Sequence, residues 1–151
     1  MSNQPSEILS VLIPMKARPW LIPSALVAEV LPLRQPERPG QGVDWLLGWL
    51  TWRGVPTPLI SFERFNESGQ VAIGQDAKIL VLNTVNEDSR FYAVIIQGDP
   101  KRKVVAEHDI QEQPDSTLGR GERALVQFED ELVIIPNLDA MEKELQPFTI
   151  E

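Results

Sequence analysis

The chain is poor in histidine and cysteine, two side chains that enzymes often use as nucleophiles, proton carriers or metal ligands. It has one histidine, His108, and no cysteine in 151 residues. A serine-histidine-aspartate triad would have to use His108, which lies in a polar stretch away from any Gly-x-Ser-x-Gly motif. One histidine without cysteine cannot build an ordinary zinc site either. We therefore expect a solvated His108, no catalytic residue, no metal and no cofactor.

Glycine pairs and carboxylates are the remaining candidates for catalytic chemistry. The glycines at residues 40–42 and 119–121 form isolated pairs, which match neither a phosphate-binding loop nor a dinucleotide fingerprint. The acidic residues 129–131 lie at an expected hairpin tip, where charge normally means solvation. Because two carboxylates are enough for some hydrolases, a carboxylate-dependent hydrolase on a small barrel stays an alternative.

The charge balance bears on the class of partner. A formal net charge of −8 repels phosphate backbones and anionic lipid headgroups. The basic triplet at residues 101–103 runs against this balance, and we interpret it as a solvated loop. An OB-like nucleic-acid-binding module is thus a second alternative, and the expected partners are proteins rather than nucleic acids.

One segment is rich in the residues that dominate protein-protein contacts. Three of the four tryptophans, Trp45, Trp49 and Trp52, precede Arg53 and Gly54. In a strand, Trp49 and Thr51 share one face and Trp52 the other. A two-stranded hairpin cannot easily bury both faces, so we expect a partly exposed tryptophan; the alternative is that all three are core. Tryptophan and arginine are enriched at binding hot spots, which predicts a protein-binding hairpin.

The elements that must position this hairpin are short strands bounded by turn residues. An apolar stretch at 25–33 carries Glu29 as its only charge, and Pro56 and Pro58 place the strand 55–60 at a sheet edge. Asn137 can cap a closing helix. The predicted strand pairs are 8–15 with 20–22, 45–52 with 55–60, 77–85 with 90–96, and 124–128 with 131–135. We also expect a helical turn at 62–65 and loops at 34–44 and 67–76. The last element is a helix at 138–145, with Leu138, Met141 and Leu145 on one face. Such a pattern is typical of an all-β barrel or sandwich with a C-terminal helix.

The N-terminus shows no targeting signal. It lacks a basic region, and the apolar run from Ile8 stops at Pro14, too early for a signal peptide or a membrane span. We expect a cytoplasmic protein without direct membrane insertion.

The tryptophan-rich segment resembles the CheW-like family. Gly48, Arg53, Gly54 and Pro58 stand where that family has a glycine, an Arg-Gly turn and a proline. Upstream, Val-Ala-Glu-Val at residues 27–30 is similar to the family's Val-x-Glu-Ile/Val element, and the later strands and closing helix follow in family order. The resemblance spans nearly the whole chain.

This resemblance implies a fold and a role. The fold would be a single CheW-like domain over residues 1–151, built of two intertwined five-stranded SH3-like β-barrels, the first mainly from about 20–75. The role would be that of a non-catalytic adaptor between chemoreceptors of the methyl-accepting type and a CheA-type histidine kinase. The partner-contacting residues implied by the family match or by the hairpin are Arg53, Gly48, Glu29, Val27, Trp49, Trp52, Thr51 and Gly54.

Three departures from the family pattern bear on partner choice. Thr51 replaces an asparagine, Ser61 replaces an aspartate, and residues 97–100 replace a Val-Asp-x-Val element. These changes favour a divergent branch, such as the chemosensory systems that run twitching motility.

Overall fold

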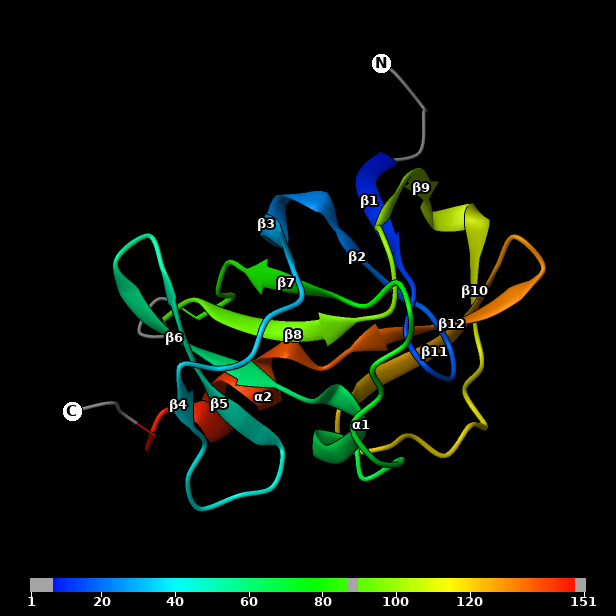
Figure 1. The fold of residues 1–151 in the computed structure, drawn as a ribbon. Helices are drawn as coiled ribbons and strands as arrows, with labels where there is room; N and C mark the ends of the chain where they lie inside the picture. Colours follow the sequence, from blue (N-terminus) through cyan, green and yellow to red (C-terminus); the bar gives the residue numbers. More distant parts are fainter. Residues whose placement is uncertain (1–6, 87–89, 149–151) are drawn as a thin grey trace.

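The computed structural model describes residues 7–86 and 90–148, which form two antiparallel-rich β-sheets and a C-terminal helix (Figure 1). The predicted all-β fold with one closing helix is confirmed. In the first sheet the strands lie in the order β10 (Ile110–Glu112), β11 (Glu122–Phe128), β12 (Glu131–Pro136), β2 (Trp20–Pro23), β1 (Glu7–Ile13) and β9 (Lys101–Ala106). In the second the order is β3 (Val27–Pro32), β7 (Lys78–Leu82), β8 (Tyr92–Ile96), β6 (Val55–Ile60), β5 (Leu46–Trp52) and β4 (Arg38–Pro39).

The two sheets differ in how the chain builds them. The second sheet is built from one continuous stretch, whereas the first joins the N-terminal hairpin β1–β2 to β9–β12 from the C-terminal half. Each sheet is completed by one parallel pair, β6 with β8 and β12 with β2. The predicted subdomain boundary near residue 75 stays a prediction, because the order of the strands in the two sheets does not define where one barrel ends and the other begins.

All four predicted hairpins form. β1 pairs with β2, β5 with β6, β7 with β8, and β11 with β12. The turn between β7 and β8 lies partly outside the described residues. The prediction that 55–60 is an edge strand is wrong, since β6 lies between β5 and β8. Pro56 and Pro58 are tolerated because β8 pairs only with Leu59 and Ile60.

Two predicted loops contain strands. The basic triplet 101–103 is not a loop: it opens β9, which pairs with β1, and Lys103 lies 2.7 Å from the Glu129 carboxylate. The stretch 34–44 contains the two-residue β4, which pairs with β5. Both segments lack the apolar alternation that marks a strand, because each lies at the edge of its sheet and is half solvated.

The two helices begin at side-chain caps. Ser61 Oγ accepts a hydrogen bond from Arg64 N at 3.3 Å and starts α1 (Phe62–Phe65), so the serine that replaces the family aspartate still caps this turn. Asn137 Oδ1 accepts from Ala140 N at 3.1 Å and starts α2 (Leu138–Leu145), as predicted. The predicted apolar face of α2 is confirmed, because Leu138, Met141 and Leu145 are all buried.

One hydrophobic cluster holds the two sheets together. It combines Ile13 and Trp20 of the first sheet with Trp49 and Leu80 of the second, and α2 adds Met141. A smaller cluster around Leu50 and Trp52 fills the other face of the second sheet.

A polar junction joins α1 to the loop before β11. The Asn66 side chain accepts from Gly121 N at 2.8 Å and donates to Glu122 Oε2 at 2.7 Å. A Cβ at Gly119 would lie 2.3 Å from Asn66 Oδ1, and one at Gly121 would lie 2.7 Å from the Phe62 ring. The glycine pair at 119–121 thus admits a close approach between the two halves of the chain.

Candidate protein-binding site

The β5–β6 hairpin projects at the left of Figure 1 and ends in a tight turn at Arg53 and Gly54. Both residues have positive φ, 49° and 77°, as the type I′ hairpin turn requires. Glycine adopts this conformation freely, whereas a side-chain-bearing residue such as arginine does so at a cost of roughly 1–2 kcal/mol. An arginine at this position therefore points to a use of its side chain.

Neighbouring side chains orient the Arg53 guanidinium. Its central carbon lies 4.5 Å from the centroid of the Trp52 ring, and Nη2 lies 3.7 Å from Glu29 Oε1. The side chain is nevertheless 68% exposed, so the predicted outward position of Arg53 is confirmed. Stacking on an aromatic face reduces the freedom of the guanidinium while leaving its donors available.

Glu29 reaches this turn from the edge strand β3. Its Oε1 accepts a hydrogen bond from Trp52 Nε1 at 2.8 Å and is the same oxygen that faces Arg53. The side chain is 42% exposed. Glu29 therefore fixes the indole on which Arg53 lies.

The expectation of an exposed tryptophan is wrong. Trp45, Trp49 and Trp52 are only 3%, 2% and 6% exposed. Both faces of β5 are covered, because Trp49 enters the main cluster between the sheets and Trp52 the smaller cluster on the other face. Alternation assigned these rings to opposite faces correctly but did not reveal that each face has a layer over it.

A profile of the CheW-like domain matches residues 10–146. The chain belongs to the CheW-like family.

A solved structure supports the CheW-like fold. The scaffolding protein TtCheW from Thermoanaerobacter tengcongensis superposes with a TM-score of 0.74 at 16% sequence identity, over 91% of this chain and 89% of that one. The two SH3-like subdomains expected from the resemblance are therefore the fold of this chain. No protein of curated description matches the sequence.

CheW-like proteins are non-catalytic scaffold proteins of chemotaxis signalling. Over residues 7–86 and 90–148, no three His, Asp or Glu side chains are grouped to hold a metal ion, and none of the helices there is long and apolar enough to cross a membrane. His108 is 69% exposed.

The eight residues expected at a partner surface of this CheW-like protein occupy three places. Glu29, Trp52, Arg53 and Gly54 meet at the hairpin turn. Trp49 lies inside the core, and Val27 is half-buried against the main cluster. Gly48 and Thr51 face the segment before and within β4.

Contacts within the chain account for Gly48 and Thr51. A Cβ on Gly48 would lie 2.3 Å from the Arg38 carbonyl oxygen, so glycine permits β4 to pack closely. Thr51 Oγ1 donates to Glu37 at 3.3 Å, and the Thr51 carbonyl accepts from Arg34 at 2.9 Å. Whether either residue contacts a partner stays a prediction.

Phe91 belongs to the same surface and was missed from the sequence. Its ring lies 4.9 Å from the Trp52 ring and is 37% exposed, and Val55, opposite Trp52 on β6, is 42% exposed. The sequence feature that could have indicated Phe91 is its place as an aromatic residue between Arg90 and the strongly apolar strand that follows. We call Glu29, Trp52, Arg53, Val55 and Phe91 the hairpin-tip site.

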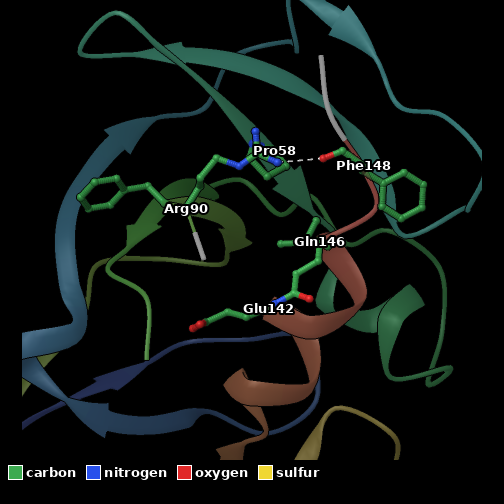
Figure 2. Close-up of a pocket in the computed structure, with 7 residues that line it drawn as sticks. Pro58, Arg90, Glu142, Gln146 and Phe148 are labelled. Carbon is green, nitrogen blue, oxygen red and sulfur yellow. Dashed lines mark hydrogen bonds between the residues drawn. The ribbon is translucent and has the colours of Figure 1, made fainter. Parts of the chain in front are cut away.

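A hollow of about 310 Å³ lies beside Phe91, between the end of α2 and β6 (Figure 2). We call it the helix hollow; its lining is Pro58, Arg90, Phe91, Glu142, Leu145, Gln146 and Phe148. Figure 2 shows Arg90 extended towards Phe148, whose carbonyl accepts from Arg90 Nη2 at 3.0 Å.

Glu142 forms part of this lining and is 1% exposed. Its carboxylate accepts hydrogen bonds from the backbone N–H groups of Val85 and Asn86, from the Asn86 amide, and from Tyr92 OH. Burial, with the adjacent Glu142 charge, raises the pKa of Tyr92 well above its usual range, so the phenol stays a donor. This network ties α2 to the segment after β7.

Proposed function

We propose that this chain is a cytoplasmic signalling adaptor that couples methyl-accepting chemoreceptors to a CheA-type histidine kinase, and that the hairpin-tip site contacts the kinase. Membership of the CheW-like family supports the adaptor role. The contact surface is supported by one observation in particular, an exposed arginine held in the left-handed region of φ on an aromatic platform.

The physical reasoning concerns pre-organisation. A guanidinium presents five donors in a planar fork that matches a carboxylate or backbone carbonyls. Because Trp52 and Glu29 already restrict Arg53, little further side-chain freedom is lost when a partner binds. The exposed parts of Val55 and Phe91 supply apolar area beside this charge.

The test is a binding measurement with purified proteins. Titration calorimetry would use this chain, the CheA-type kinase of the same organism, and a chemoreceptor cytoplasmic fragment. We expect Arg53→Ala to weaken kinase binding by about tenfold or more, as hot-spot arginines do. Alanine at position 53 keeps the same backbone cost, so thermal unfolding should change little.

The matched control is Arg102→Ala on β9, an exposed arginine of the other sheet. It should bind the kinase as the parent chain does. Full kinase binding by Arg53→Ala would refute the contact surface, and failure of the parent chain to bind a kinase would refute the adaptor function.

The departures at Thr51, Ser61 and residues 97–100 support a divergent branch, and we propose the twitching-motility systems. Deletion of the gene should then abolish surface twitching and leave swimming intact. The opposite phenotype would assign the chain to a flagellar system.

A further inference from the structure

The hairpin-tip site does not end at Phe91. The Trp52 ring has Arg53 at 4.5 Å and Phe91 at 4.9 Å, and Phe91 also lines the helix hollow. A chain of contacts therefore runs from the exposed guanidinium of Arg53, through the largely buried Trp52 ring, to the partly exposed Phe91 at the hollow near the end of α2.

The helix hollow combines apolar walls with one available cation. Phe91, Leu145 and Phe148 supply the apolar part. Arg90 is exposed, donates to the Phe148 carbonyl, and is paired with no carboxylate among the residues that the structure places. Among the residues 7–86 and 90–148 its acceptor is the Phe148 carbonyl, and an acceptor from outside can bind its other donors.

The other charge of the hollow is already satisfied. Glu142 is buried, and four donors from the segment after β7 and from Tyr92 share its carboxylate. The carboxylate keeps its charge, but these donors occupy its oxygens and hold it in place. The exposed charged group that the lining offers to a ligand is therefore the Arg90 guanidinium, whereas the Glu142 carboxylate is buried.

We propose that the helix hollow is a second contact point for the protein that binds the hairpin-tip site, and that it takes an apolar side chain next to a carboxylate. The apolar side chain enters between Phe91 and Leu145, and the carboxylate receives the Arg90 fork. The occupant is an acidic, apolar segment of the kinase, so this inference rests on the proposed function. Continuity with Arg53 through Phe91 places both contacts on one partner.

The test measures kinase affinity by titration calorimetry for three variants of the full chain. Arg90→Glu reverses the charge and should weaken binding by about tenfold or more. Arg90→Lys keeps the charge without the fork and should lie between Arg90→Glu and the parent. Gln146→Trp fills the hollow from the exposed C-cap position of α2 and should weaken binding without removing an internal side-chain contact.

The control is Arg102→Glu, the same charge change on β9, which should bind within about twofold of the parent. Circular dichroism and thermal unfolding identify any variant that has lost its fold.

Two results would overturn the inference, and they are distinguishable. If Arg90→Glu and Gln146→Trp bind like the parent while Arg53→Ala binds weakly, the hollow is not a contact and the proposed function stands. If the parent chain binds no kinase, the proposed function and this inference both fall. If Arg102→Glu loses as much kinase affinity as Arg90→Glu, the effect comes from the overall charge of the chain. That result would also count against the helix hollow as a contact.

Discussion

A single oxygen, Glu29 Oε1, serves two groups at the hairpin-tip site. It accepts the Trp52 indole N–H at 2.8 Å and faces the Arg53 guanidinium at 3.7 Å. The ion pair is exposed and contributes little to stability. The indole bond matters more, since the donor is on a ring that is only 6% exposed. Glu29 is the glutamate of the family's Val-x-Glu element. In this chain it has a structural role as well, because it accepts the hydrogen bond of the Trp52 indole.

This arrangement separates two substitutions at Glu29. Glu29→Ala leaves a largely buried N–H without its partner and should lower the free energy of unfolding by about 1–3 kcal/mol. Glu29→Gln keeps an oxygen acceptor and should stay close to the parent in stability. Urea unfolding followed by tryptophan fluorescence measures both, and equal losses for the two variants would contradict this role of the acceptor.

Glu63 gives the molecule a pH-dependent residue outside the hairpin-tip site. It is 4% exposed in α1, and burial raises the pKa of its carboxyl above 4.5, with backbone hydrogen bonds and Lys16 opposing the rise. A folded-state pKa above the unfolded one means that protonated Glu63 favours the fold. This contribution is fully present below pH 4.5 and is lost as the pH rises through the folded-state pKa.

The neutral variant Glu63→Gln should therefore be more stable than the parent at pH 7, and the difference should shrink towards pH 4. Guanidinium unfolding at a series of pH values measures this. A variant less stable than the parent at pH 7 would show that the ionised carboxylate is held by partners that outweigh its burial.

At the scale of elements, residue periodicity predicted the hairpins and the apolar face of α2, because both depend on local spacing. It did not predict β9 or β4, whose sequences are polar, or the interior position of β6. It also did not predict that Phe91 meets Trp52, since that contact is created when β6 pairs with β8. Local sequence patterns predict which side chains share a face and where the chain turns, whereas the order of strands in a sheet depends on contacts between distant segments.

The junction between α1 and the loop before β11 makes a prediction at this scale. A methyl group at Gly121 would lie 2.7 Å from a buried Phe62 ring atom and 3.2 Å from Phe65. Gly121→Ala should lower the free energy of unfolding by about 1–3 kcal/mol, the usual cost of overpacking. Thermal unfolding measures the change.

Gly54→Ala is the informative comparison for Gly121→Ala. Nothing lies within 4 Å of a Cβ at Gly54, so only the left-handed backbone opposes it. A loss of about 1 kcal/mol is expected there. If Gly121→Ala is harmless, the two halves of the chain are less tightly joined than the Asn66 contacts indicate.

At the scale of the whole molecule, the family resemblance supplied what periodicity could not, namely two SH3-like subdomains packed around a shared core. The tryptophans illustrate the difference. Their burial follows from the layers on both sides of β5, and the number of layers is a property of the assembled sheets.

The interleaved first sheet predicts that the C-terminal third is indispensable. A chain ending at residue 98 lacks β9 to β12 and α2, so β1 and β2 lose both flanking strands and the main cluster loses Met141. We expect this fragment to aggregate or to lack fixed tertiary structure, as judged by gel filtration and proton NMR. A folded, monomeric fragment would show that the second sheet is self-sufficient.

The parallel pairing of β2 with β12, through Trp20 and Ile134, has a consequence for biosynthesis. During synthesis β2 leaves the ribosome well before β12, so it must wait for this partner. Until then an apolar hairpin is without its neighbours and open to pairing with other nascent chains. Slow translation of the segment between β2 and β12 would lengthen that exposure.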